Sequence, residues 1–236
     1  MGGPPPRPFN PKSEIRNPQF SMLSFFDPTR VRRLLCLGAH SDDIEIGAGG
    51  TILRLLAEHP GLEVRWVVFC GADDRRRAEA AASADRFLDG CRTKRVDVHA
   101  FRDGYLPWQG EKVKDEFEAL KRSFDPDLIL TQFRDDRHQD HRVVSDLAYN
   151  TWRNHTVLEY EILKYDGDLG RPNCYVPLGA DVCDKKVELL MGAFATQRSR
   201  QWFTDDTFRA MLRIRGVECN APSRFAEAFH CRKIVL

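Results

Sequence analysis

Residues 33–50 read RLLCLGAHSDDIEIGAGG, an apolar run followed at once by a histidine and two aspartates. The apolar run at 33–39 predicts a short buried β-strand, because strands covered on both faces are continuous in apolar residues. Residues 49–58 have the composition of a helix that ends before a Pro-Gly pair. The histidine and both aspartates are therefore expected on a tight loop at the carboxyl end of the strand.

Strand and helix patterns alternate along the rest of the chain. Further strands are predicted at 63–70, 95–101, 127–132 and 158–163, and helices at 74–88, at 111–124 and from His141 onward. The pattern weakens after Gly167, where 184–194 and 205–215 have helical character and 226–229 is a late strand or a loop. This alternation predicts the α/β class, with a mostly parallel central sheet between two layers of helices.

The overall composition is that of one large α/β domain with an N-terminal arm. The chain has 236 residues, of which 42% are hydrophobic, and its formal net charge is +1. This balance predicts neither a nucleic-acid partner nor binding to an anionic membrane, and no apolar run approaches the ~20 residues that span a bilayer. Residues 1–29 are rich in Pro, Gly and Asn and are expected to form a mobile arm, with residues 30–236 as the ordered domain.

The cysteines indicate a reducing compartment. The seven cysteines are scattered, and no two have the spacing of a zinc ribbon or a redox motif. The N-terminus also lacks the apolar core of a secretory signal. These features predict free thiols and a cytoplasmic location.

A second polar cluster follows the predicted strand at 127–132. Residues 137–142 read RHQDHR, with one imidazole on each side of a carboxylate. Because the carboxyl ends of parallel strands lie at one edge of a sheet, and active sites of such sheets lie beyond that edge, the two clusters are expected to converge. Histidines and aspartates from two strand ends are typical of a centre for one divalent metal ion.

The spacing of these residues assigns a role to each of them. A zinc hydrolase needs three protein ligands, an open position for water and a base beside that water. We expect the ligands to be His40, Asp43 and His141, and the base to be Asp42, which lies between the first two ligands in the sequence. As a cation, His138 would donate to the oxyanion of a tetrahedral intermediate or protonate the leaving amine.

Other acidic and imidazole side chains have weaker assignments. Asp140 is expected to orient His138 or His141 from outside the metal centre. Glu45 is interpreted as a helix cap or a solvated carboxylate. Three histidines without a partner at ligand spacing are interpreted as surface or core residues, namely His59, His99 and His155.

Two other classes of function stay open at this point. A magnesium-dependent phosphoryl-transfer enzyme would use Asp42, Asp43 and Asp140, but magnesium prefers oxygen ligands, whereas two imidazoles favour zinc or a similar transition metal. A non-catalytic sugar-binding or scaffold protein on the same fold would have no physical need for Asp42 beside the metal. The hydrolase is therefore preferred.

The segments at 39–43 and 138–141, with the order of strands and helices between them, resemble the LmbE/PIG-L family of zinc-dependent N-acetylglucosaminyl deacetylases. The resemblance covers about residues 33–229. It implies a Rossmann-like fold, one zinc ion per chain with the three ligands named above, the base at position 42 and an electrostatic catalyst at position 138. The family usually has Pro where this chain has Ser41. Because proline stiffens a loop, the serine would loosen the ligand loop or add a hydrogen bond without displacing the ligands.

Residues beyond the metal centre suggest where a substrate would bind. The family often places an Arg and a Glu three residues apart on the helix after the second strand, as Arg76 and Glu79 are here. Asp103 follows the third predicted strand at the same edge of the sheet, and its alternative is an ordinary Asp-Gly turn. Two late segments resemble family elements that line the mouth of the site, and they contribute the candidates Arg198, Glu227 and His230.

Two further features bear on the substrate. Trp108 and Trp202 would either stack on a sugar face or lie in the core. If several of the arginines in the last third of the chain converged, the substrate would be anionic; scattered surface charge is the alternative.

The resulting prediction is hydrolysis of the N-acetyl group of an amino sugar or its conjugate, with release of acetate and a free amine. Whether the sugar is nucleotide-linked stays open. The alternative within hydrolases is a deacylase of a longer acyl chain or of a thiol-sugar conjugate in natural-product assembly. The expected partner is this small-molecule substrate, and a homo-oligomer stays open.

Overall fold

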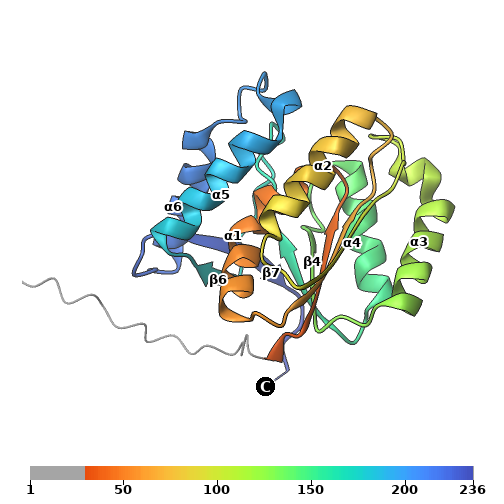
Figure 1. Cartoon of the computed structure of the whole chain (residues 1–236), viewed down its shortest axis with the longest axis horizontal. Coiled ribbons are helices and arrows are strands. Elements are labelled where there is room, and N and C mark those ends of the chain that lie inside the picture. The colour runs from red at the N-terminus through yellow and green to blue at the C-terminus, as the bar shows by residue number, and fades with distance from the viewer. Residues whose placement is uncertain (1–29, 236) are drawn as a thin grey trace, which may run out of the picture.

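The computed structural model describes residues 30–235, so the predicted arm at 1–29 lies outside the described residues. A seven-stranded sheet has the order β3-β2-β1-β4-β5-β7-β6 (Figure 1). The strands are β1 (Arg33–Gly38), β2 (Glu63–Val68), β3 (Thr93–Val98), β4 (Leu128–Gln132), β5 (Thr156–Tyr160), β6 (Cys174–Pro177) and β7 (Ala226–Cys231). The first five pair in parallel, and β7 pairs antiparallel with both β5 and β6. The predicted mostly parallel α/β sheet is thereby confirmed.

Helices cover both faces of the sheet. They are α1 (Asp43–Glu58), α2 (Asp74–Phe87), α3 (Gly110–Ser123), α4 (Gln139–Thr151), α5 (Ala180–Ala193) and α6 (Asp205–Glu218), with 3-10 turns η2 (Leu106–Gln109) and η3 (Ala195–Gln197). Figure 1 shows α3 and α4 on one side of the sheet and α1, α2 and α5 on the other. No helix among residues 30–235 is long and apolar enough to cross a membrane.

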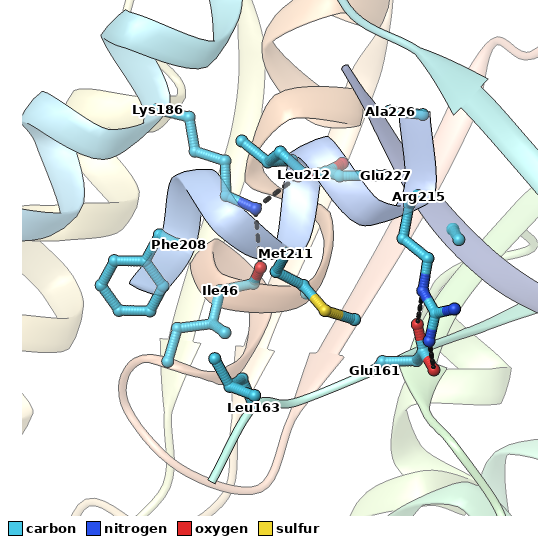
Figure 2. A pocket seen from close by; sticks show the side chains of 12 residues that line it. Ile46, Glu161, Leu163, Lys186, Phe208, Met211, Leu212, Arg215, Ala226 and Glu227 are labelled. Carbon is cyan, nitrogen blue, oxygen red and sulfur yellow. Dashed lines mark hydrogen bonds and ion pairs between the residues drawn. The ribbon is translucent and has the colours of Figure 1, made fainter. Parts of the chain in front are cut away.

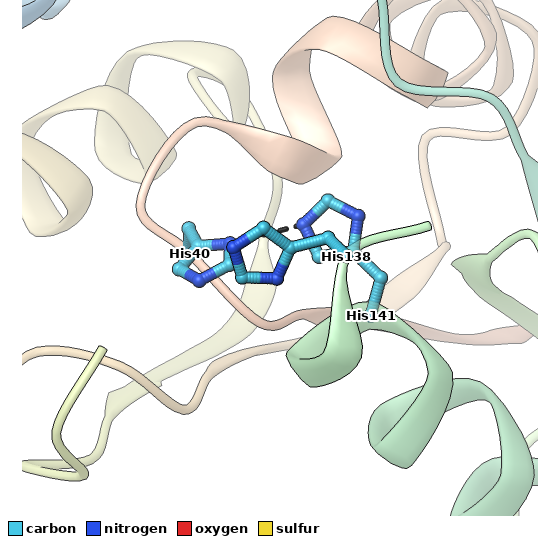
Figure 3. A group of neighbouring side chains, drawn as sticks. All are labelled: His40, His138 and His141. Carbon is cyan, nitrogen blue, oxygen red and sulfur yellow. Dashed lines mark hydrogen bonds between the residues drawn. The ribbon is translucent and has the colours of Figure 1, made fainter. Parts of the chain in front are cut away.

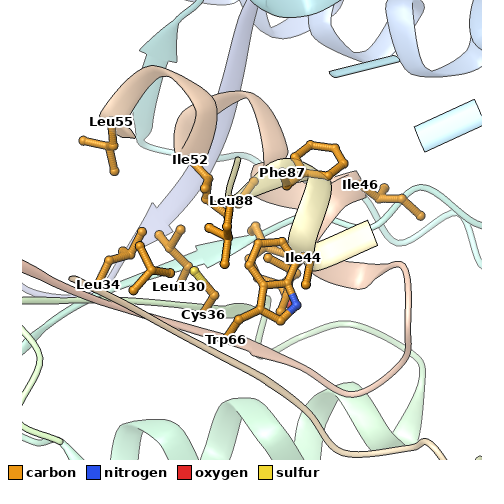
Figure 4. Packing of buried hydrophobic residues seen from close by; sticks show 14 of the residues in the cluster. Leu34, Cys36, Ile44, Ile46, Ile52, Leu55, Trp66, Phe87, Leu88 and Leu130 are labelled. Atoms are coloured by element: carbon orange, nitrogen blue, oxygen red, sulfur yellow. The ribbon is translucent and has the colours of Figure 1, made fainter. Parts of the chain in front are cut away.

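The core consists of one layer on each face of the sheet. In β1, Leu34 and Cys36 point into the layer beneath α1 and α2, where they meet Trp66 (Figure 4). Leu35 and Leu37 point into the opposite layer with residues of α3 and α4. Because side chains of a strand alternate between faces, a strand covered on both faces is apolar at every position, as the run at 33–39 indicated.

The order of the strands creates a crevice at one edge of the sheet. The chain leaves β1 toward β2 on one side, and β4 returns to pair with β1 on the other. Ligands of open α/β sheets bind where the strand order reverses in this way, beyond the carboxyl ends of the two central strands. The loops after β1 and β4, which contain both polar clusters, therefore meet at this crevice.

Helix α1 begins at Asp43, six residues before the helix predicted from the sequence. Gly47, which directly follows this first turn, lowered its helical signal, because glycine is a poor helix former. The close packing of α1 on the sheet explains this glycine: a Cβ added to Gly47 would lie 2.2 Å from Cδ2 of Tyr160. The expectation that Asp43 lies in a loop is therefore wrong, since Asp43 is the first residue of a buried helix.

The substitution Gly47→Ala is expected to destabilise the protein. Tyr160 is fully buried and its hydroxyl donates to the carbonyl oxygen of Leu37 at 2.6 Å, so its ring has no room to retreat. Overpacking of this kind costs roughly 1–3 kcal/mol, which urea unfolding monitored by circular dichroism would measure. Gly110→Ala is the matched control, because a Cβ there would meet nothing within 4 Å. Equal stability of the two variants would contradict the proposed close contact.

Several other boundaries differ from the prediction. Helix α4 begins at Gln139 rather than at His141, because His138 caps it: its Nδ1 accepts from the backbone N–H of Asp140. Strand β3 ends at Val98 and β5 at Tyr160, and both lie a few residues earlier than expected. The four-residue strand β6 was not predicted, since it is short, lies at the sheet edge and depends on pairing with β7.

Candidate metal centre

Three imidazoles lie together at the carboxyl edge of the two central strands. His40 lies in the turn between β1 and α1, and His138 and His141 lie at the start of α4, just after β4. Figure 3 shows the three rings next to one another, with a contact between His40 and His141. The predicted convergence of the two clusters is therefore present in the fold.

Three donor atoms form a triangle of the size that zinc requires. Nδ1 of His40 lies 3.0 Å from Nε2 of His141, and Oδ2 of Asp43 lies 3.6 Å from the first atom and 3.4 Å from the second. Ligand bonds of 2.0–2.1 Å in a tetrahedron place ligand atoms roughly 3.3 Å apart. Two nitrogens and a carboxylate oxygen at this spacing fit one zinc ion with a fourth position open.

His138 brings a ring nitrogen within 4.8 Å of the other two imidazoles and is the alternative third donor. Its Nδ1 is already an acceptor for the start of α4, from the N–H of Asp140 at 3.3 Å. Oδ2 of Asp43 accepts two hydrogen bonds, from the N–H of His40 at 2.8 Å and from Nε2 of Gln132 at 2.9 Å. These bonds hold the carboxylate close to both imidazole nitrogens. We therefore assign Asp43 as the ligand and place His138 beside the centre.

Buried carboxylates hold both imidazole ligands from behind. Oδ2 of Asp136 lies 2.8 Å from Nδ1 of His141, and Oδ2 of Asp140 lies 3.3 Å from Nε2 of His40. Such contacts fix the tautomer and orientation of a metal-binding histidine. Asp140 thus supports His40, whereas the sequence suggested His138 or His141. The backbone N–H groups of Gly104 and Leu106 donate to Asp140 at 2.7 Å and 3.1 Å and hold it in place.

Asp42 lies next to the ligand set without belonging to it. Its side chain is buried, and its Oδ1 accepts from Nη2 of Arg76 at 3.1 Å. Burial raises the pKa of Asp42 against the opposing influence of the Arg76 guanidinium, and the charge of Asp43 raises it further. A carboxylate with a raised pKa is a stronger base, which suits the role predicted for Asp42.

The contact between Arg76 and Asp42 makes a prediction for the pH profile. The base acts in its ionised form, and the positive charge of Arg76 stabilises that form. In Arg76→Met the pKa of Asp42 rises, so the acidic limb of the profile of kcat/KM against pH is expected to move to higher pH. A limb that stayed in place or moved to lower pH would show that Asp42 is not the group that titrates there.

The surroundings of His138 disfavour its cationic form. Burial lowers its pKa, and the neighbouring imidazoles His40 and His141, whose ring centroids lie 4.6 Å and 4.7 Å away, lower it further. The role expected from the sequence uses the cation of His138, and two adjacent imidazoles make that charge less favourable.

Four of the five candidate substrate residues fall into two groups by their distance from the metal centre. Arg76 and Asp103 are at the centre: Arg76 contacts Asp42, and Oδ1 of Asp103 lies 3.0 Å from Nε2 of His40. Arg198 and Glu227 are not brought to it. Arg198 donates to a carbonyl oxygen at the end of α5, and Glu227 is buried and accepts from the N–H groups of residues 50 and 51 of α1.

The fifth candidate, His230, is mostly buried and stacks on Phe133, with ring centroids 3.8 Å apart. Its Nε2 has no hydrogen-bond partner within the described part of the chain, and Oε1 of Glu161 is 3.9 Å away. Phe133 directly follows β4. His230 therefore lies close to the carboxyl edge of the sheet, but no contact joins it to the metal centre.

The structure corrects one further expectation and decides another question that the sequence had left open. Glu45 is fully buried rather than capping or solvated, because it lies on the face of α1 that packs inward, and burial raises its pKa well above the usual range. The cationic side chains of the last third do not converge. Those engaged with local acids, carbonyl oxygens or rings are Arg198, Arg209, Arg213, Arg215, Arg232 and Lys233.

The two tryptophans have different environments. Trp108 is 75% exposed on η2, which excludes the core as its location. Trp202 is partly buried and packs against Phe203, with ring centroids 5.7 Å apart. Trp108 is therefore the more exposed of the two, and its ring centroid lies 5.8 Å from that of Tyr105.

The sheet and its donor cluster define an α/β protein with a group of side chains at the strand edge that could hold a metal ion. The model of the PIG-L family, described as GlcNAc-PI de-N-acetylase, matches residues 35–152, which is half of the chain. The chain belongs to this family and is therefore a hydrolytic enzyme of the deacetylase class. The matched residues contain every ligand and outer carboxylate described above.

Solved structures share the fold across most of the chain. N,N'-diacetylchitobiose deacetylase from Pyrococcus horikoshii is 23% identical, with a TM-score of 0.67, covering 86% of this chain and 84% of that one. Teicoplanin deacetylase Orf2, in a zinc-inhibited form, is 17% identical, with a TM-score of 0.66 and coverage of 84% and 96%. The hydratase GalB from Pseudomonas putida KT2440 is 18% identical, with a TM-score of 0.67 and coverage of 87% and 98%. At these identities the likeness establishes the shared fold.

Proposed function

We propose that this chain is a zinc-dependent N-deacetylase that hydrolyses the acetamide of an amino sugar or an amino-sugar conjugate. The observation that carries the proposal is the division of roles between two adjacent carboxylates. Asp43 lies within 3.6 Å of both imidazole ligands, while Asp42 is hydrogen-bonded to Arg76. A ligand and a separate base side by side are what metal-assisted hydrolysis needs.

The residues of the site supply the proton transfers. Zinc, when bound, acts as a Lewis acid that polarises the amide carbonyl and lowers the pKa of a water molecule. Asp42 removes a proton from the attacking water, the C–N bond breaks, and the departing nitrogen takes up the proton held by Asp42 to leave as an amine. His138 lies beside the ligands, and a hydrogen bond donated by its ring would stabilise negative charge on the former carbonyl oxygen.

The kind of substrate is inferred from the family and from the charges at the site. The family model and two structural neighbours are named for deacetylation of GlcNAc-PI, diacetylchitobiose and teicoplanin. Most cationic side chains of the last third of the chain already have local partners. These contacts leave few cations free to hold a diphosphate, so a sugar conjugate without one is preferred to a nucleotide sugar. Arg76 and Asp103 would hydrogen-bond its hydroxyl groups.

The test is acetate release by zinc-loaded protein from free N-acetyl sugars, oligosaccharides, nucleotide-linked N-acetyl sugars and thiol-linked N-acetyl sugars. We expect release from at least one uncharged member and little from the nucleotide-linked members. Release only from the nucleotide-linked members would overturn the preference for a conjugate without a diphosphate. Release of a longer acid from an N-acyl series, with no acetate from any member, would replace deacetylation by deacylation. One structural neighbour, GalB, is named as a hydratase. If this chain added water to an unsaturated acid and cleaved no amide, the proposed reaction would be rejected.

A further inference from the structure

The carboxylate behind His141 belongs to a larger buried network. Asp136 is 2% exposed and accepts three hydrogen bonds. Its Oδ1 accepts from the N–H of His138 at 2.7 Å, and its Oδ2 accepts from Nδ1 of His141 and from Nζ of Lys164, both at 2.8 Å. Each donor leaves Asp136 less freedom to turn away from His141.

Lys164 reaches this network from a different part of the chain. It follows β5, 28 residues after Asp136. Its side chain is 11% exposed and lies between two buried carboxylates, because Nζ also donates to Oδ2 of Asp168 at 2.6 Å. Asp168 accepts in turn from the N–H of Arg137 at 2.7 Å. Residues 164–168 are thus fastened to the loop that precedes α4.

The ammonium of Lys164 makes this arrangement electrostatically possible. Asp136 and Asp168 are both almost completely buried, and the same ammonium lies within 2.8 Å of each. Without it, two carboxylates would face each other with little solvent to screen them, which is costly in a protein interior. Asp136 would then turn or shift, and Nδ1 of His141 would lose the acceptor that fixes its tautomer.

We infer that Lys164 is a positioning residue for the metal ligand His141 and acts on it through Asp136. The inference rests on the metal centre assigned above, but not on the substrate or the reaction. Lys164 sets how tightly zinc is held, because it holds Asp136 against Nδ1 of His141 and so keeps Nε2 of His141 aimed at the other two ligands. Loss of an outer partner of this kind typically weakens metal binding by about tenfold to a hundredfold.

A second buried ion pair provides a matched control. Arg215 of α6 forms two hydrogen bonds with Glu161, at 2.9 Å and 2.7 Å, as Figure 2 shows. The side chains are 7% and 4% exposed, and Glu161 also accepts from the N–H of Gly170 at 3.1 Å. This pair anchors the same segment after β5 as Lys164 does, but no contact joins it to Asp136 or to a metal ligand.

The experiment compares Lys164→Met and Arg215→Met with the wild type, using the full chain without substrate. Zinc Kd is measured by competition with a chelator, the ligand geometry by the absorption of the cobalt-substituted protein, and folding by the Tm of the metal-free form. Lys164→Met is expected to raise zinc Kd by about tenfold or more and to alter the cobalt absorption. Arg215→Met is expected to lower Tm while it leaves zinc Kd within about threefold of the wild type.

Two results would overturn the inference. One is a zinc Kd for Lys164→Met equal to that of the wild type, and the other is an equal increase in both variants, which would indicate general loosening of the segment. If Lys164→Met does not fold, Lys164→Gln takes its place: its amide can still donate to Asp136 but carries no positive charge between the two carboxylates, so zinc Kd is again expected to rise, and a wild-type zinc Kd would reject the role of the ammonium. Since no substrate is used, a protein that binds zinc in this way but releases no acetate would contradict the proposed function and leave this inference standing.

Discussion

The substitution Asp42→Asn is expected to lower kcat by a factor of about 10³ while zinc binding stays unchanged. The amide of Asn has the shape of the carboxylate but cannot take a proton from water. The side chain of Asp42 accepts a hydrogen bond from Arg76 and is separate from the three proposed ligands. The turn into α1 and the position of Asp43 should therefore persist. Acetate release gives kcat, and chelator competition gives zinc Kd for the same samples.

The matched control for this variant is Asp74→Asn. Asp74 lies in the first turn of α2 with its side chain 96% exposed, and it forms only an ion pair with Arg77 in the same helix. We expect this variant to keep wild-type kcat and zinc Kd. A kcat for Asp42→Asn within about tenfold of the wild type would show that another group is the base. A loss of zinc in Asp42→Asn would show instead that Asp42 is a ligand.

Removal of the metal is expected to have an effect of similar size. Protein stripped with a chelator should lose nearly all acetate release, and one equivalent of zinc or cobalt should restore it. The reason is the donor set, two imidazole nitrogens and one carboxylate oxygen at mutual distances of 3.0–3.6 Å. Nitrogen donors suit zinc and its transition-metal neighbours.

Magnesium is the discriminating control, because it prefers an octahedron of oxygen ligands. Millimolar magnesium should not restore the stripped protein. Restoration by magnesium alone, or a stripped protein that stays fully active, would contradict the assignment of the centre. His141→Ala should bind zinc far more weakly than the wild type, since it removes one of only three protein ligands.

The sequence was informative about the centre because its main residues are local. Each of the two clusters lies within a few residues of an apolar strand, and parallel strands bring their carboxyl ends to one edge. The same reasoning failed for the first turn of α1, since Gly47, which follows that turn and packs closely on Tyr160, lowers the helical signal. It also failed for β6, whose existence depends on pairing with β7.

Residues that support the ligands from outside were harder to foresee. Asp136 lies five residues before His141 in a polar stretch, and this proximity was the available signal for its role. Nothing in the sequence pairs it with Lys164, because that contact joins the loops after β4 and β5. Glu227 is an error of the opposite kind, a residue given a role that it does not have. Its place in a family-like segment predicted contact with the substrate, but from β7 its side chain accepts from N–H groups of α1.

The sequence by itself therefore determined the class of fold and the edge of the sheet where the two clusters meet, and it supplied the ligands and base that we propose. These depend on apolar periodicity and on residues that are neighbours in the chain. Only the tertiary structure decided which carboxylate supports which imidazole, that Arg76 contacts Asp42, and that Lys164 reaches Asp136. Those pairings depend on the direction of side chains from elements far apart in sequence, and a one-dimensional pattern does not encode such directions.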